Sequence, residues 1–240
     1  MYDATEPPRD PDGGRDDRQR PRSGATPRSR RGFFIAVEGP TGAGKTTLVR
    51  RLPASLDAQP VFDPFEDNPF LAARYQASRG QAIESLAVLT ELTFLALRVT
   101  QLREVGAALA DGRSVVADWS MIKQLVFAGL TLARTDRDRL ASTCAIWCSD
   151  LPVPDLVVQL RADVGTLRAR ITERGREMES GLSDAHLGLL SRAFDTAFAR
   201  HGAPVLVVDA ALFDVFDDEV VTRLAERIRF MVTSEEAECA

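Results

Sequence analysis

The sequence contains few cysteines and no long apolar run. Its 240 residues include three cysteines, Cys144, Cys148 and Cys239. They are too few for a disulfide scaffold, and the first two do not have the spacing of a zinc knuckle or a redox-active CxxC pair. No apolar run approaches the roughly 18 residues that a membrane span requires, and no signal-peptide core lies near the start. We therefore expect a cytoplasmic protein that does not associate with membranes.

Basic side chains are outnumbered by acidic ones outside the first 31 residues. Residues 1–31 carry eight Arg against six Asp or Glu, whereas the rest of the chain carries 22 basic and 29 acidic side chains, a net charge of −7. Because an acidic body does not suit a nucleic-acid backbone, we expect no nucleic-acid partner. Residues 1–31 also hold five Pro and almost nothing apolar. We predict that they form a disordered tail before one domain, residues 32–240.

Lysine occurs at only two positions, Lys45 and Lys123, against 28 arginines. A lysine that persists against such a bias indicates a position where arginine cannot do the same work. Lys45 is the first candidate for such a position and Lys123 is the second.

Strand and helix signals alternate along the domain. Short apolar runs predict strands at 33–37, 61–62, 114–118, 155–160 and 205–209. Helical patterns lie at 82–109, 164–174, 184–200 and 217–231. Strands that are separated by helices pair in parallel. The sequence therefore predicts an α/β fold with a doubly wound, five-stranded parallel sheet flanked by helices.

The strongest motif is Gly39-x-x-x-x-Gly44-Lys45-Thr46, which follows a predicted strand and begins a helix. Its glycines let backbone N–H groups surround phosphate oxygens, Lys45 reaches the β- and γ-phosphates, and the Thr46 hydroxyl binds Mg²⁺. This motif makes the predicted fold one of the P-loop NTPase type, and we expect ATP and Mg²⁺ as cofactors. The predicted ATP contacts in this loop are Gly39, Thr41, Gly42, Ala43, Gly44, Lys45, Thr46 and Thr47.

Two acids follow predicted strands, Asp63 after the second and Asp118 at the end of the third. In a parallel sheet, ligands bind beyond the carboxyl ends of the strands. If the phosphate acceptor is a hydroxyl, Asp63 can take its proton as a general base, whereas the alternative is that Asp63-Pro64 is only a turn. Asp118 is placed to hold Mg²⁺ or its waters near Thr46.

The helix pattern from Val88 to Val99 is apolar on all sides, yet it contains Glu91 and Arg98. Seven residues are nearly two helical turns, so both side chains face the same way, about 10 Å apart. Buried charges without partners are costly. We favour a polar cavity lined by both residues over the alternative, a structural ion-pair network.

Three arginines, Arg170, Arg174 and Arg176, lie where a predicted helix ends at Gly175. Guanidinium groups match phosphoryl oxygens, so these residues are expected to form an Arg-rich lid over the ATP phosphates. The alternative is a solvated basic helix end, which the helix dipole would favour.

The ordered set of motifs resembles the deoxynucleoside kinases, and in particular the bacterial deoxyguanosine/deoxyadenosine kinase subgroup. The similar stretches span nearly all of residues 33–210: FIAVEGPTGAGKTTL (34–48), DPFEDNPFLAARY (63–75), the helix with Glu91 and Arg98, VVADWSMIKQLVFA (115–128), DLPVPDLVVQLRA (150–162) and RITERGREME (170–179).

This resemblance implies ATP-dependent phosphorylation of the 5′-hydroxyl of a purine deoxynucleoside, a small-molecule substrate, in nucleotide salvage. It further implies a homodimer formed by helix packing. By position, Asp63 matches the acid that deprotonates the 5′-hydroxyl, and Tyr75 and Glu179 match contacts to the sugar 3′-hydroxyl. Glu91 matches the base-reading residue, and Arg98 matches the arginine that steadies the catalytic acid.

The remaining matches concern the ATP end of the site. Asp118 corresponds to the acid of the Asp/Glu-Arg-Ser motif, and the three lid arginines correspond to those that hold ATP phosphates. The sequence departs from the family at the base, which is usually Glu and here is Asp63, and at Trp119, which replaces the arginine of the motif. The stretch from Tyr75 to Glu91 is longer than in the family and lacks a tryptophan.

The base preference follows from hydrogen-bond chemistry. Guanine offers two adjacent donors, N1–H and the 2-amino group, and a carboxylate accepts both, whereas adenine offers one donor beside one acceptor. Glu91 therefore favours deoxyguanosine, with deoxyadenosine as the second purine substrate. Two alternatives stay open: a nucleoside monophosphate kinase similar to thymidylate kinase, which would need an arginine for the acceptor phosphate, and a non-catalytic P-loop nucleotide-binding protein.

Overall fold

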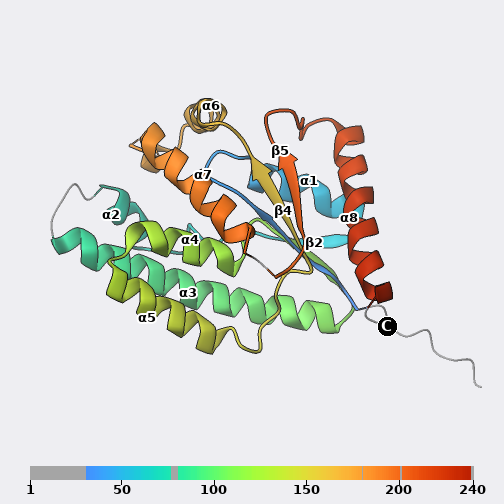
Figure 1. Cartoon of the computed structure of the whole chain (residues 1–240), viewed down its shortest axis with the longest axis horizontal. Coiled ribbons are helices and arrows are strands. Elements are labelled where there is room, and N and C mark those ends of the chain that lie inside the picture. Colours follow the sequence, from blue (N-terminus) through green and yellow to red (C-terminus); the bar gives the residue numbers. More distant parts are fainter. Residues whose placement is uncertain (1–30, 77–80, 180, 201, 239–240) are drawn as a thin grey trace, which may run out of the picture.

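The computed structural model describes residues 31–76, 81–179, 181–200 and 202–238 and centres on one five-stranded sheet (Figure 1). Every strand is parallel to its neighbours, and the order across the sheet is β2-β3-β1-β4-β5. The strands are β1 Phe34–Glu38, β2 Ala58–Val61, β3 Ser114–Ala117, β4 Leu156–Arg161 and β5 Val205–Asp209. The predicted fold class and the five strand signals are confirmed, with β2 earlier than its signal by a few residues.

The helices that join the strands are α1 Lys45–Leu56, α2 Leu71–Gln76, α3 Gln81–Ala110, α4 Met121–Thr131, α5 Arg134–Trp147, α6 Val164–Arg174, α7 Asp184–Phe198 and α8 Asp218–Glu238, with a short 3₁₀ helix at Glu177–Glu179. The sequence did not predict α2, α4 and α5. In α5 only Leu140 and Cys144 are buried, so the helix carries a weak apolar stripe. The N-terminus of α4 is capped by Ser120, whose hydroxyl accepts a hydrogen bond from the backbone N–H of Ile122.

Helices cover both faces of the sheet, as a doubly wound fold requires. The central strand shows why: Ile35 and Val37 pack in the core that α1 and α8 close, whereas Phe34 packs against α3 on the opposite face. All five residues of β1 are buried. Figure 1 shows α1 and α8 on one side, and α3, α4 and α5 on the other.

The long helix α3 differs from one expectation. Its segment Glu84–Ala110 has a mean hydropathy of 1.3 and is long and apolar enough to cross a membrane by length and composition. In the structure this helix packs against β3, α4 and α5, and residues such as Leu95 and Leu102 are buried there. Burial inside the domain therefore accounts for part of the apolarity of α3, since 44% of its apolar window is buried.

The first 31 residues are outside the described part of the chain, apart from Arg31, whose guanidinium lies 3.5 Å from the Asp155 carboxylate. The tail and the domain boundary at residue 32 stay predictions.

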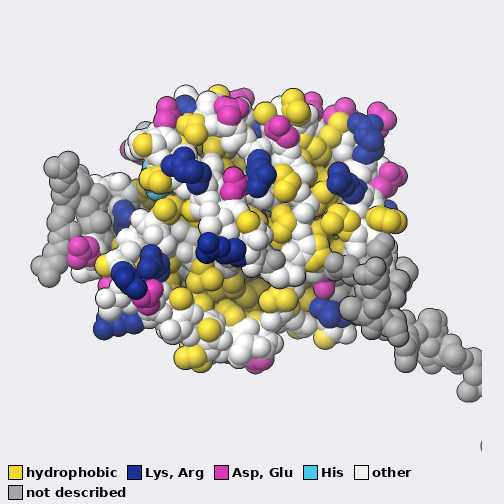
Figure 2. Space-filling view, in the orientation of Figure 1, with side chains coloured by type: hydrophobic (Ala, Val, Ile, Leu, Met, Phe, Trp, Pro, Cys, Tyr) yellow, Lys and Arg dark blue, Asp and Glu magenta, His cyan; other side chains and the backbone are white. Residues whose placement is uncertain are grey.

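On the face drawn in Figure 2, Lys and Arg side chains are interspersed with Asp and Glu.

Candidate active site

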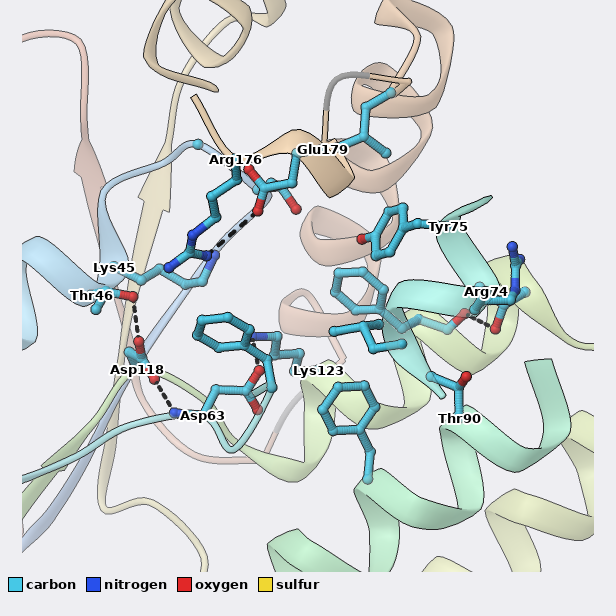
Figure 3. Close-up of a pocket in the computed structure, with 18 of the residues that line it drawn as sticks. Lys45, Thr46, Asp63, Arg74, Tyr75, Thr90, Asp118, Lys123, Arg176 and Glu179 are labelled. Carbon is cyan, nitrogen blue, oxygen red and sulfur yellow. Dashed lines mark hydrogen bonds and ion pairs between the residues drawn. The ribbon is translucent and has the colours of Figure 1, made fainter. Parts of the chain in front are cut away.

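A cavity of about 520 Å³ lies beyond the carboxyl ends of the central strands (Figure 3). This is where a parallel α/β sheet binds its ligands. Most of the predicted site residues line it, namely Thr41, Gly42, Gly44, Lys45, Thr46, Thr47, Asp63, Tyr75, Glu91, Arg98, Asp118, Arg174, Arg176 and Glu179. Three predicted residues, Gly39, Ala43 and Arg170, do not line it.

The loop between β1 and α1 requires glycine for its shape. Gly39 has a φ of 146°, and a Cβ there would lie 2.4 Å from the carbonyl oxygen of Leu160. Gly42 has a φ of 86°, and its Cβ would lie 2.7 Å from the carbonyl oxygen of Leu167. A side chain at either position would therefore push the loop away from the strand and helix behind it.

Lys45 folds back on this loop. Its Nζ donates hydrogen bonds to the carbonyl oxygens of Gly39 at 2.8 Å and Pro40 at 2.9 Å. Burial and the nearby charge of Lys123 lower the pKa of Lys45 to about 8, although the carboxylates of Glu38 and Asp118 oppose this shift. A bound phosphate group would place a compensating negative charge beside this ammonium group.

Asp118 joins the phosphate loop to the second acid of the site. Its Oδ2 accepts a hydrogen bond from the Thr46 hydroxyl at 2.5 Å, and its Oδ1 accepts one from the backbone N–H of Asp63 at 2.6 Å. The hydroxyl and the carboxylate are hard oxygen donors, which fit Mg²⁺ that arrives with nucleotide phosphates. The predicted proximity of Asp118 to Thr46 is confirmed.

The Asp63 carboxylate lies between two cations inside the cavity. Arg98 donates to Oδ1 from Nε at 3.1 Å and from Nη2 at 2.8 Å, and Lys123 donates to Oδ2 at 2.9 Å. Burial raises the pKa of Asp63, but Arg98 and Lys123 outweigh it and hold the pKa well below its usual range. Asp63 is therefore ionised at neutral pH and fixed in orientation.

Glu91 and Arg98 are both buried, at 4% and 2% exposure, and both line the cavity. A third residue, Gln124, bridges them: its Nε2 donates to Glu91 Oε2 at 2.6 Å, and its Oε1 accepts from Arg98 Nη1 at 2.8 Å. Thr131 donates to the other Glu91 oxygen at 3.0 Å. The predicted cavity is confirmed, and the ion-pair network that was the alternative is present as well, through Arg98 and Asp63.

Trp119, which replaces the arginine of the family motif, is fully buried. The Arg98 guanidinium lies over its ring, 5.6 Å from the centroid, and over the Phe94 ring at 4.6 Å. Trp119 therefore packs against Arg98 and supplies no charge, while Lys123 provides the second cation beside Asp63.

The lid arginines divide between two roles. Arg174 and Arg176 line the cavity and both approach the Glu179 carboxylate, Arg176 at 3.6 Å, and the Arg176 guanidinium lies 4.4 Å from the centroid of the Phe65 ring. Arg170 instead donates to the carbonyl oxygens of Ala43 at 3.3 Å and Ala210 at 2.6 Å. In this structure Arg170 braces the phosphate loop from behind, which differs from the predicted phosphate contact.

Tyr75 and Glu179 lie close together at the upper side of the cavity in Figure 3. Tyr75 is 37% exposed and Glu179 is buried. Although the residue as a whole is partly exposed, the Tyr75 hydroxyl points into the cavity in Figure 3, where its desolvation and the nearby Glu179 charge raise its pKa. The two residues that were predicted to contact the sugar are therefore brought together by the fold.

Sequence reasoning missed several residues of the site. Glu38 is fully buried at the end of β1, where its Oε1 accepts hydrogen bonds at 2.7 Å from both the backbone N–H and the hydroxyl of Ser120. Its position directly before the glycine loop was a usable signal. Gln124, Thr131 and Arg74 gave none, because uncharged polar residues and single arginines on helices are common.

Taken together, the cavity has at one end the phosphate loop and two oxygen ligands, Thr46 and Asp118, that could hold a metal ion, and a buried carboxylate, Glu91, farther along α3. A fixed carboxylate, Asp63, lies next to the Thr46–Asp118 pair. This arrangement suits transfer of a phosphoryl group from a nucleoside triphosphate to a hydroxyl group.

Comparisons with known proteins agree with this geometry. The chain is 30% identical over 206 residues to deoxyguanosine kinase of Bacillus subtilis, covering 83% of this chain and 97% of that protein. It is 33% identical over 197 residues to thymidylate kinase of Cereibacter sphaeroides, covering 75% of this chain and 88% of that protein. A solved structure of deoxyadenosine kinase from M. mycoides matches with a TM-score of 0.68 at 21% identity, covering 82% and 99% of the two chains, and supports the fold.

The family model of deoxynucleoside kinase matches residues 35–233, which include the phosphate loop, the acids and the lid described above. The resemblance drawn from the motifs is thereby confirmed. The chain belongs to the deoxynucleoside kinase family.

Proposed function

We propose that this chain transfers the γ-phosphoryl group of ATP, with Mg²⁺, to the 5′-hydroxyl of a purine deoxynucleoside, with deoxyguanosine preferred. The observation that carries the proposal is the Asp63 carboxylate, whose backbone N–H bonds Asp118 while Asp118 bonds Thr46 of the phosphate loop. A hydroxyl that meets the γ-phosphate there has a carboxylate beside it. A phosphate acceptor would not need one.

The residues around Asp63 determine how it acts as a general base. Its lowered pKa makes it a weak base toward a free hydroxyl, so it accepts the proton at Oδ as the substrate oxygen bonds to phosphorus and becomes acidic. Arg98 and Lys123 hold the carboxylate in place. Pre-organised groups of this kind lower the entropic cost of reaching the reactive geometry.

The cationic side chains at the phosphate-loop end of the cavity would bind the phosphates. Lys45, Arg174 and Arg176 line the cavity and are placed to neutralise negative charge on the transferred group. Thr46 and Asp118 would hold Mg²⁺, which when bound neutralises phosphate charge and aligns the β- and γ-phosphates.

The base preference rests on Glu91. Its two oxygens are oriented by Gln124 and Thr131, and each carboxylate oxygen keeps a further lone pair for a ligand. Two adjacent acceptors match guanine N1–H and the 2-amino group. The 30% identity to a deoxyguanosine kinase supports the same preference.

The second candidate is a nucleoside monophosphate kinase, which the 33% identity to a thymidylate kinase favours. That activity needs a free arginine to bind the acceptor phosphate. Arg98 is poorly suited to this because Asp63 and Gln124 already occupy three of its nitrogen atoms.

We further propose that the protein assembles as a homodimer. A homodimer formed through helix packing is supported by Leu89 and Leu92 on α3 and Trp147 on α5, which are 43%, 46% and 51% exposed. The molar mass in solution, measured by light scattering, tests it. A cytoplasmic enzyme of nucleotide salvage is the corresponding proposal for its location and role.

The deciding experiment is a phosphotransfer assay with ATP and Mg²⁺ against the four deoxynucleosides and the four deoxynucleoside monophosphates. We expect strong turnover on deoxyguanosine and weaker turnover on deoxyadenosine. Turnover on a monophosphate alone would favour the second candidate and remove Asp63 from its role. Saturable ATP binding without turnover on any of these acceptors would indicate a nucleotide-binding protein.

A further inference from the structure

Arg74 is a cationic residue of the cavity that the mechanism above does not use. It lies on α2 and lines the same cavity as Glu91. Its Nε is buried and donates no hydrogen bond, and no acidic residue in the described part of the chain forms an ion pair with it. A guanidinium with a buried, unsatisfied donor is costly unless a ligand supplies an acceptor.

The position of Arg74 relative to Glu91 is set by the fold. Asn68, which is buried just before α2, donates from Nδ2 to the backbone carbonyl of Thr90 at 3.0 Å. Thr90 immediately precedes Glu91 on α3, so this bond fixes the loop that leads into α2 beside the buried carboxylate. The backbone N–H of Arg74 bonds the carbonyl of Phe70, which ties Arg74 to the same loop.

Figure 3 shows Arg74 and Thr90 at the end of the cavity opposite Lys45 and Thr46. The charge of Arg74 reaches Glu91, where it opposes the increase in pKa that burial causes. Arg74 is therefore far from the phosphate loop and close to the residue that reads the base. Its natural ligand is an acceptor on the nucleobase, since the phosphates lie at the other end.

We propose that Arg74 is a specificity-determining residue that donates a hydrogen bond to O6 of the purine, next to the N1–H and 2-amino groups bound by Glu91. This inference rests on the proposed function and extends it. A carboxylate and a guanidinium that line the same end of one cavity offer acceptors and donors in the pattern that guanine complements, and arginine is the side chain most often bonded to guanine O6 and N7.

The same pair discriminates against adenine. Adenine carries an amino group where guanine carries O6, so the donors of Arg74 would face another donor. Adenine N1 is an acceptor and would face the Glu91 carboxylate. A site whose polar groups are left unpaired by the wrong ligand rejects it strongly.

The test uses the full chain and its variant Arg74→Met, in which an unbranched apolar side chain replaces the arginine side chain and the guanidinium is removed. Four acceptors separate the contributions of the base: deoxyguanosine, deoxyinosine (which keeps O6 and N1–H), the 2-aminopurine deoxynucleoside (which lacks O6) and deoxyadenosine. We expect kcat/KM to fall by about tenfold or more for the two acceptors with O6. For the other two it should stay within about twofold of wild type or rise.

The KM for ATP should not change, because Arg74 lies at the opposite end of the cavity. Arg103→Met is the matched control: Arg103 lies on α3 with its guanidinium 5.8 Å from the centroid of the Trp147 ring, and it does not line the cavity. This control should leave all four values unchanged. An equal loss on all four acceptors with Arg74→Met, or no loss on deoxyguanosine, would overturn the proposal.

Binding of deoxyguanosine by calorimetry separates this inference from the proposed function. If wild type phosphorylates no nucleoside but binds deoxyguanosine at least about tenfold more tightly than Arg74→Met, the reaction is wrong and the role of Arg74 stands. If wild type phosphorylates deoxyguanosine and Arg74→Met binds it equally well, the reaction stands and the role of Arg74 is wrong. Absence of both turnover and binding in wild type overturns both.

Discussion

Replacing Asp63 with Asn would remove the carboxylate that pairs with both Arg98 and Lys123 while keeping the side-chain volume. We expect kcat to fall by about a hundredfold to ten-thousandfold, the usual contribution of a positioned general base. ATP binding should change little, because the proposed phosphate contacts are those of Lys45 and the lid arginines. The Asp63→Glu variant keeps the carboxylate and should retain more activity than Asp63→Asn.

The same substitution has a cost in stability that follows from burial. The Arg98 and Lys123 side chains are only 3% and 13% exposed. Removing one partner of a buried pair costs about 3–5 kcal/mol, and we expect the lower end because Gln124 still accepts a hydrogen bond from Arg98. Chemical denaturation monitored by circular dichroism measures this difference in the free energy of unfolding.

The pH dependence of the stability follows from the direction in which the Asp63 pKa is shifted. The pKa of Asp63 is lower in the folded than in the unfolded state, so its stabilisation is present above about pH 4 and decreases as the pH falls below that value. The gap in stability between wild type and Asp63→Asn should therefore shrink in acid. Asp195→Asn is the control, since Asp195 pairs with Arg161 at 2.8 Å on the surface and should affect stability by at most about 1 kcal/mol and activity not at all.

Turnover of Asp63→Asn at the wild-type rate, in protein shown to be folded, would refute the assignment of Asp63 as the base. A loss of ATP affinity as large as the loss of kcat would refute the separation of the two ends of the cavity.

Three further predictions concern the rest of the cavity. Glu91→Gln should lower kcat/KM for deoxyguanosine by about tenfold or more and raise it for deoxyadenosine, and an unchanged substrate ranking would contradict this. Because burial raises the pKa of Glu91, wild type should lose deoxyguanosine activity on acidification, and Glu91→Gln should remove this pH-dependent loss. Lys45, with a pKa of about 8, should take up protons when ATP binds at pH 8; calorimetry in two buffers of different ionisation enthalpy should show uptake that is absent in Lys45→Arg. Gln124→Met should lower kcat/KM for deoxyguanosine by about tenfold, because it removes the bridge from Glu91, whereas Gln159→Met, which alters another buried glutamine, should not.

The parallel sheet and the phosphate loop could be predicted from the sequence because their signals are local. Apolar runs of strand length and the helical patterns between them specify βαβ units. The loop from Gly39 to Thr46 is readable because its glycines and lysine have one physical use at that spacing. Helices α4 and α5 escaped prediction. The sequence of α5 is mostly polar and buries only Leu140 and Cys144, so its amphipathic period is weak, whereas α4 is apolar over most of its length.

The site residues divide along the same line. Asp63, Glu91 and Asp118 stood out because a charge at the end of a strand or inside an apolar helix is costly unless it is used. Gln124 and Arg74 carried no such signal. Gln124 contributes through contacts with partners distant in the chain, such as the Arg98–Gln124 bond across 26 residues, whereas Arg74 is notable for its place in the cavity lining.

By itself, the sequence determined the fold class, the phosphate-binding loop and the acids that work beside it, since these depend on local periodicity and on residue chemistry at short spacing. Only the tertiary structure decided which groups neutralise them. It brought Lys123 to Asp63 across 60 residues, linked Glu91 to Arg98 through Gln124 and turned Arg170 toward the back of the phosphate loop. It also left the buried Nε of Arg74 without a hydrogen-bond partner among the described residues. Hydrogen bonds and ion pairs act over a few ångströms in space, and separation along the chain does not reveal which side chains will come that close.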